Sequence, residues 1–250
     1  MNGDAIRLAG IDVRYRDRLA LDGVDLAIDA GERVALIGSN GAGKSTLLRV
    51  VAGTLSPTAG HVDLLDEPLA GLSRMGIARR LAVVPQAAAL PFATRVEEVV
   101  GLGRLPHEDP FRGPRAADHA VIARAIDRVG IRDLVGRDAR ELSLGERQLV
   151  LIAMAVAQDT PILLLDEPTV HLDLRHQVAA MELLVGLNEG EGMTVVAVLH
   201  DLTMAAHFFP RLVLIDHGRI VEDGPPDVVL APQRIRDIFG VDPALVRLGS

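Results

Sequence analysis

The stretch VALIGSNGAGKSTLLRVVAG, residues 34–53, decides the fold. An apolar run of strand length ends in a glycine-rich loop, and KSTLLRVVAG then continues as a helical pattern that Gly53 ends. The loop, GSNGAGKST (38–46), matches the phosphate-binding pattern G-x-x-x-x-G-K-[ST] between a strand and a helix. Its glycines let backbone N–H groups wrap phosphates, and the new helix adds its positive end. The motif therefore predicts a nucleotide site, with Lys44 on the β- and γ-phosphates and the Ser45 hydroxyl on Mg²⁺.

Strand-like and helical patterns alternate outward from this loop. Apolar runs such as ILLL (162–165) and VVAVL (195–199) are typical of strands buried on both faces, which indicates a parallel sheet covered by helices. Residues 94–158, by contrast, carry helical patterns, interrupted by a loop rich in Pro, Gly and Arg at 104–115. We therefore predict an α/β fold with an all-helical insertion. The predicted boundaries are 1–250 for a single domain, 1–86 and 159–250 for its core, and 87–158 for the helical subdomain.

Composition narrows the class of protein. The chain has 250 residues, 49% of them hydrophobic but only 2% aromatic, so its core must be aliphatic. A net charge of −8 argues against a broad nucleic-acid-binding face, and we expect no nucleic-acid partner. No cysteine is present, which excludes disulfides and thiol chemistry. Because no apolar run approaches the ~20 residues of a membrane span and MNGDAIRLAG does not resemble a signal peptide, we expect any membrane association to go through a protein partner.

A second acidic motif, ILLLDEP (162–168), is expected to complete the nucleotide site. Its apolar run predicts a buried strand that ends in Asp166, where a carboxylate can hold Mg²⁺ directly or through water. Glu167 follows at once, and a carboxylate there can orient and deprotonate an attacking water. Taken alone, however, Asp-Glu-Pro after a strand is also an ordinary turn.

The same five letters, LLDEP, also occur at residues 64–68, which provides an internal control. This copy follows a short strand-like run, VDLL, and leads into LAGLSRMG, where no further motif is found. We interpret its Asp66 and Glu67 as a solvated turn outside the site.

Four further elements stand in a characteristic order around the second copy. Gln86 ends the predicted strand LAVVPQ, and LSLGERQ (142–148) opens a helix ahead of Asp166. His171-Leu172-Asp173 follows it, and His200 ends the next predicted strand. This series resembles the ATP-binding-cassette (ABC) ATPases across essentially the whole chain.

The resemblance implies a P-loop core with an antiparallel β portion near the amino terminus, and a head-to-tail dimer in which each ATP lies between one phosphate loop and the partner's LSLGE helix. The ATP-binding residues it implies are Tyr15, Gly38, Ser39, Asn40, Gly41, Ala42, Gly43, Lys44, Ser45 and Thr46, with Ser143, Gly145, Glu146 and Asp173 acting at the dimer seam. The implied catalytic residues are Glu167, His200, Lys44 and Gln86, and those at Mg²⁺ are Ser45, Gln86 and Asp166. Tyr15 would stack on adenine, although a tyrosine on a strand is often simple packing.

Two positions depart from the family pattern. Leu144 stands where the signature usually has its first glycine, and Val170 where a small polar residue is common. A backbone N–H survives at Leu144, so contact with a phosphate remains open to it. The added bulk near the partner's nucleotide is expected to slow closure of the dimer and therefore turnover.

Three segments resemble the subgroup of bacterial importers for iron-siderophores, haem and cobalamin. They are LGRLPH (102–107), EPTVHLDLRHQ (167–177) and GMTVVAVLHDLTMAA (192–206). The resemblance implies a motor at the cytoplasmic face of the membrane that works with permease subunits and, indirectly, a substrate-binding protein. The alternatives are an importer of metal ions or oxyanions, or an ABC ATPase with no transport role.

Overall fold

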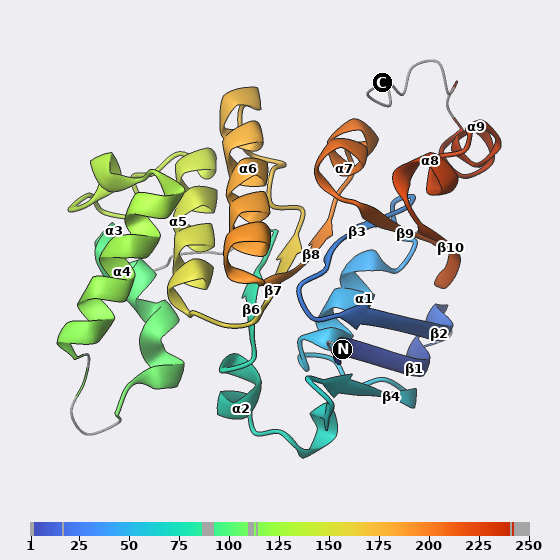
Figure 1. Ribbon diagram of the computed structural model, residues 1–250, viewed down its shortest axis with the longest axis horizontal. Helices are drawn as coiled ribbons and strands as arrows, with labels where there is room; N and C mark the ends of the chain where they lie inside the picture. The colour runs from blue at the N-terminus through green and yellow to red at the C-terminus, as the bar shows by residue number, and fades with distance from the viewer. Residues whose placement is uncertain are drawn as a thin grey trace.

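The computed structural model describes residues 3–16, 18–86, 93–109, 113, 115–240 and 242. Its centre is a six-stranded sheet in the order β10-β9-β3-β8-β7-β6 (Figure 1). These strands are β3 (Arg33–Ile37), β6 (Leu81–Val84), β7 (Ile162–Asp166), β8 (Thr194–Val198), β9 (Arg211–Asp216) and β10 (Arg219–Gly224). All pairs are parallel except β9 with β10, which is an antiparallel pair at the edge. The carboxyl ends of β3, β7 and β8 therefore meet at one edge of the sheet.

A second, four-stranded antiparallel sheet in the order β2-β1-β4-β5 lies beside the first. Its strands are β1 (Asp4–Tyr15), β2 (Arg18–Asp29), β4 (Ala59–Leu64) and β5 (Glu67–Pro68). Helix α1 (Lys44–Val51) lies between the two sheets, and α2 (Arg74–Ala78) follows β5 after a short 3-10 turn, η1 (Leu69–Gly71).

The inserted helices lie on the side of the central sheet that is opposite to the antiparallel sheet (Figure 1). They are α3 (Val96–Gly101), η2 (Leu102–His107), α4 (Ala116–Val129), η3 (Arg132–Leu134) and α5 (Leu144–Ala157). The remaining helices are α6 (Leu174–Glu191), α7 (Leu202–Phe208), α8 (Pro226–Val229), α9 (Pro232–Arg234) and the π-turn η4 (Ile235–Phe239). None of the described helices is long and apolar enough to cross a bilayer.

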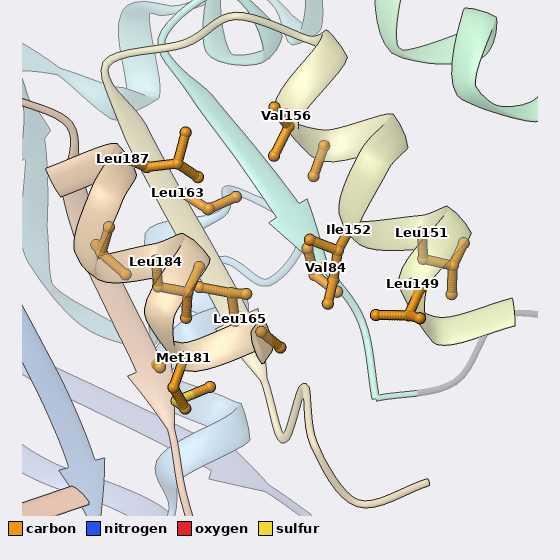
Figure 2. Packing of buried hydrophobic residues seen from close by; sticks show 14 of the residues in the cluster. Val84, Leu149, Leu151, Ile152, Val156, Leu163, Leu165, Met181, Leu184 and Leu187 are labelled. Atoms are coloured by element: carbon orange, nitrogen blue, oxygen red, sulfur yellow. The ribbon is translucent and has the colours of Figure 1, made fainter. Parts of the chain in front are cut away.

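The alternating faces of each central strand explain the layers. On β7, Leu163 and Leu165 pack into a cluster with α5 and α6 (Figure 2), while Ile162 and Leu164 belong to a second cluster with α1 and the antiparallel sheet. Fully burying such a side chain contributes about 1.5–3 kcal/mol. Both faces of the central sheet are therefore covered, and the few aromatic residues leave an aliphatic core.

The predicted fold class is confirmed: an α/β core, an antiparallel β portion at the amino terminus and an inserted set of helices. The boundaries stay predictions, since residue 87 lies outside the described part of the chain and the first helix described after β6 begins at Val96. Sequence patterns missed α2, α7 and the two-residue strand β5, which are too short to show a period.

Candidate nucleotide-binding site

The phosphate loop connects the end of β3 to the start of α1, and backbone contacts fix its shape. Gly38 has φ +148°, and a Cβ there would lie 2.0 Å from the Ile215 carbonyl oxygen. Gly43, at φ +114°, caps α1, and its Cβ would lie 2.7 Å from the Ala20 carbonyl oxygen. Only glycine fits such close approaches at positive φ. The neighbouring backbone thus requires glycine at positions 38 and 43.

Lys44 begins α1 and is only 5% exposed. Its ammonium donates to the carbonyl oxygens of Gly38 at 2.8 Å and Ser39 at 2.9 Å. Burial lowers the pKa of Lys44, while the nearby charges of Glu167 and Asp166 oppose that shift. The side chain is therefore held beneath the loop that would surround the phosphates.

Asp166 ends β7 opposite the same loop. Its Oδ1 accepts a hydrogen bond of 3.0 Å from the Ser45 hydroxyl, which joins residues 121 positions apart. Burial raises the pKa of Asp166, and the Ser45 hydrogen bond works in the opposite direction. A hydroxyl and a carboxylate oxygen at this separation are a donor set that Mg²⁺ prefers. These two residues fit the predicted magnesium role.

Glu167 is the point at which the remaining catalytic candidates meet. Its Oε2 accepts a 2.5 Å hydrogen bond from Gln86 Nε2, and its Oε1 is hydrogen-bonded to His200 Nε2. The residue has φ +52°, and its N–H donates to the Val198 carbonyl of β8 at 3.2 Å. A residue other than glycine at positive φ costs on the order of 1 kcal/mol or more of stability. Such strained conformations are often found at functional sites. The turn after β7 thus aims the carboxylate at Gln86 and His200.

A pocket of about 410 Å³ joins the phosphate loop to Glu167 and His200, while Gln86 and Asp166 line a neighbouring pocket. The first pocket is lined by Tyr15, Arg18, Ala20, Asn40, Gly41, Ala42, Gly43, Lys44, Ser45, Thr46, Glu167 and His200. Tyr15, 43% exposed, ends β1 at this pocket. Arg18 and Ala20 come from β2 and were not expected from the sequence, because no motif marks them. Only the pairing of β1 with β2 carries them to the loop.

The expected dimer-seam residues form a separate group at the amino-terminal ends of α5 and α6. Ser143 caps α5: its hydroxyl accepts from the Glu146 N–H at 3.2 Å, and Glu146 Oε2 accepts from the Ser143 N–H at 2.8 Å. The latter hydrogen bond is the main reason that the pKa of Glu146 lies below its usual value. A Cβ on Gly145 would lie 3.0 Å from the His171 carbonyl oxygen. The start of α5 therefore sits directly against the turn that leads to α6.

Asp173 caps α6, where it accepts hydrogen bonds from the N–H and Nδ1 of His176 at 2.9 and 2.8 Å. The backbone hydrogen bond is the main cause that lowers the pKa of Asp173. None of Ser143, Gly145, Glu146 and Asp173 lines the pocket. Leu144 and Val170, the two departures from the family pattern, are 59% and 48% exposed. Within one chain, the signature residues thus lie away from the pocket at the phosphate loop.

The first LLDEP copy lies outside the site, as expected. Asp66 is an exposed turn residue with φ +62°. The interpretation of Glu67 as part of the turn is wrong in detail, because Glu67 pairs with Leu64 in β5 and its carboxylate forms a 2.5 Å ion pair with Arg80. A two-residue strand carries no periodic signal that the sequence could reveal.

Tyr15→Ala is expected to raise the Michaelis constant for ATP more than it lowers turnover. Stacking binds the ground and transition states alike, so its loss weakens binding without slowing the chemical step. The size should be roughly 1 kcal/mol, the usual value of an aromatic contact. Steady-state ATPase kinetics measure both constants, and an unchanged Michaelis constant would return Tyr15 to a packing role.

Comparison with known proteins identifies the family. The family model described as "ABC transporter" matches residues 21–170. The cobalamin import ATP-binding protein of Halobacterium salinarum is 43% identical over 95% of this chain and 61% of its own length. The hemin import ATP-binding protein of Nocardia farcinica is 46% identical over 94% of this chain and 82% of its own. The ferric enterobactin transport ATP-binding protein of Escherichia coli is 37% identical over 96% and 90%. The chain thus spans less than two thirds of the first of these relatives.

Solved structures that resemble this chain belong to the same family. A metal-chelate type ABC transporter in an inward-facing conformation aligns with a TM-score of 0.83 at 28% identity, covering 96% of this chain and 90% of that one. A dimeric ATP-binding cassette bound to ADP and Pi aligns with a TM-score of 0.78 at 28% identity, covering 88% and 98%. The matched segment includes the phosphate loop, the LSLGE helix and the Asp166–Glu167 pair. This chain belongs to the ABC transporter family.

Proposed function

We propose that the chain hydrolyses MgATP as the ATP-binding subunit of an ABC importer for an iron-siderophore, haem or cobalamin-type chelate. One observation carries the ATPase part. Lys44, Ser45, Glu167 and His200 line one pocket, and hydrogen bonds join Asp166 to Ser45 and Gln86 to Glu167 beside it. Each of these groups has a separate task in phosphoryl transfer, and a packing role for all of them together has no physical reason.

The chemistry assigns a role to each group. The loop N–H groups and Lys44 bind the phosphates, and Ser45, Asp166 and Gln86 would hold Mg²⁺. When bound, the metal ion neutralises charge on the phosphate oxygens. Glu167 accepts the proton of the attacking water through one of its carboxylate oxygens. His200 holds that carboxylate through Nε2, and because it lines the same pocket it would also contact the γ-phosphate.

A second copy of the chain completes the site in this proposal. The start of α5 offers helix N–H groups and the Ser143 hydroxyl, a combination suited to an anion. Yet the residues of that helix start do not line the pocket of their own chain. A head-to-tail dimer brings the exposed helix start of one copy to the phosphate loop of the other, and Asp173 to the seam.

The cargo proposal rests on the relatives' names and on the three segments that resemble the chelate importers. The structure adds detail to one of these segments, LGRLPH, which forms η2. Its Arg104 is 7% exposed, forms a 3.0 Å ion pair with Asp118 of α4 and donates to the Ala157 carbonyl at 2.8 Å. Arg104 therefore links η2 to α4 and to the end of α5. Leu102 and Leu105, 48% and 53% exposed, remain available to a permease.

The remaining assignments follow from this role. The chain would act at the cytoplasmic face of the membrane, bound to permease subunits and served by a substrate-binding protein. The groove between the helical subdomain, 87–158, and the core, near Gln86, would carry the contact with the permease. Import of a bare metal ion or an oxyanion is the second candidate, because the three segments are also compatible with a scaffold shared between importers. An ABC ATPase with no transport role, such as one that acts on nucleic acid, is disfavoured by the net charge of −8.

Uptake by reconstituted vesicles tests the proposal. The chain, its cognate permease and binding protein are placed in proteoliposomes, with Lys44→Ala as the control that keeps the assembly but removes the phosphate contact. We expect ATP-dependent uptake of a siderophore, haem or cobalamin-type chelate, and none with the control. Uptake of a bare metal ion, with no response to any chelate, would contradict the cargo and leave the ATPase standing.

A further inference from the structure

Arg18 lies in the nucleotide pocket although no motif includes it. Among the described residues that line the pocket, Lys44 and Arg18 supply the positive charges and Glu167 the carboxylate. Lys44 is buried under the loop, whereas Arg18 is exposed. Because the chain has a net charge of −8, a second positive side chain at this pocket suggests a role in binding an anion.

The β1–β2 hairpin fixes where Arg18 stands. Tyr15 and Arg18 are the last paired residues of the hairpin, directly opposite each other. Side chains of opposed residues in an antiparallel pair share one face of the ribbon, with Cβ atoms about 5 Å apart. Arg18 therefore lies next to the side chain expected to carry the adenine.

A hydrogen bond ties the same guanidinium to the phosphate loop. Arg18 Nη2 donates to the Gly41 carbonyl oxygen at 2.9 Å. Gly41 has φ +77°, and a Cβ there would lie 3.3 Å from that nitrogen, so a glycine at this position allows the approach. Arg18 thus lies between Tyr15, which is expected to stack on adenine, and the loop expected to bind the β- and γ-phosphates.

The guanidinium has donors to spare. An arginine carries five N–H donors, and within the described part of the chain Arg18 makes this one hydrogen bond and no ion pair. Guanidinium groups suit phosphate oxygens because the planar fork donates two parallel hydrogen bonds. Between the base and the β-phosphate of a nucleotide, the anionic group is the α-phosphate.

We propose that Arg18 is a nucleotide-binding residue that contacts the α-phosphate while it remains bonded to Gly41. The inference rests on the proposed ATP site and adds a residue to it. Since ATP and ADP both carry the α-phosphate, the contact should strengthen the binding of both nucleotides equally. It leaves the chemical step at the γ-phosphate unchanged.

The test compares Arg18→Ala and Arg18→Gln with Arg14→Ala, an exposed arginine on β1 that does not line the pocket. Calorimetric titration measures ATP and ADP binding, and steady-state kinetics measure turnover. Both Arg18 variants should lose roughly tenfold in affinity for ATP and for ADP, the worth of a charge-assisted hydrogen bond. Turnover at saturating ATP should stay near that of the unaltered chain, and Arg14→Ala should match it throughout.

Several results would overturn the inference. Glutamine can still donate to Gly41, so full affinity in Arg18→Gln would reduce Arg18 to a clamp on the loop. Adenosine used as a competitor carries no phosphate, and weaker binding of adenosine to the variants would place the contact at the base. A loss for ATP without a loss for ADP would place it at the γ-phosphate. Failure of the unaltered chain to bind ATP would instead overturn the ATP site itself.

Discussion

Glu167→Gln is expected to stop ATP hydrolysis while ATP binding stays intact. The amide keeps the shape of the side chain and can still contact Gln86 and His200, but it cannot accept the proton of the attacking water. Loss of a positioned general base costs roughly 10²–10⁴-fold in rate. Phosphate release measures the rate, and equilibrium binding measures the affinity. Since binding continues without turnover, the variant should also accumulate an ATP-bound dimer, visible by size-exclusion chromatography.

Glu67→Gln is the matched control for this prediction. It makes the same substitution in the other LLDEP copy, where the carboxylate pairs with Arg80 on the surface of β5. Exposed ion pairs contribute little to stability, so this variant should hydrolyse ATP at the normal rate. Near-normal hydrolysis by Glu167→Gln would show that Glu167 is not the base.

Asp166→Asn should remove most of the ATPase activity, and Asp66→Asn should change it little. Asp166 is partly buried and bonded to Ser45, and its neutral amide is a poorer partner for Mg²⁺. We expect a loss of at least about tenfold, as for other residues that orient a metal. The loss should shrink as Mg²⁺ is raised, which a titration of activity against Mg²⁺ would measure.

Asp66 makes a sharp control because asparagine tolerates its left-handed backbone, φ +62°, as well as aspartate does. The substitution therefore leaves the turn intact while it removes the charge. Equal losses in the two variants would mean that the first copy takes part in the site after all.

The sequence predicted the parts of the site that rest on local geometry. A strand, a glycine loop and a helix are contiguous, so the residues from Gly38 to Thr46 could be assigned from their order alone. Asp166 and Glu167 could be assigned because an apolar strand ends at them. The meeting of Gln86, Glu167 and His200 was expected from the family resemblance. Its physical reason is that β6, β7 and β8 are parallel, so their carboxyl ends lie at one edge of the sheet.

Other features depend on register and tertiary packing, which a sequence pattern does not carry. Arg18 reaches the pocket only because β2 pairs with β1 so that it faces Tyr15. Arg104 belongs to the LGRLPH segment, and only the packing of the helices shows that it is buried against Asp118 of α4. The separation of Ser143 from the pocket of its own chain, by contrast, agrees with the dimer seam that the family resemblance implied.

The central claim is that two copies share each ATP site, and a mixing experiment tests it most directly. Lys44→Ala removes the phosphate contact from one half, and Gly145→Asp blocks the other by adding bulk 3.0 Å from the His171 carbonyl and a negative charge at the helix start. Each variant alone should be inactive, since every dimer of it has two damaged sites. Mixed dimers contain one intact site, so ATP hydrolysis should reappear when the two inactive proteins are combined. A mixture as inactive as its parts, or full activity in Gly145→Asp alone, would contradict a site shared between copies.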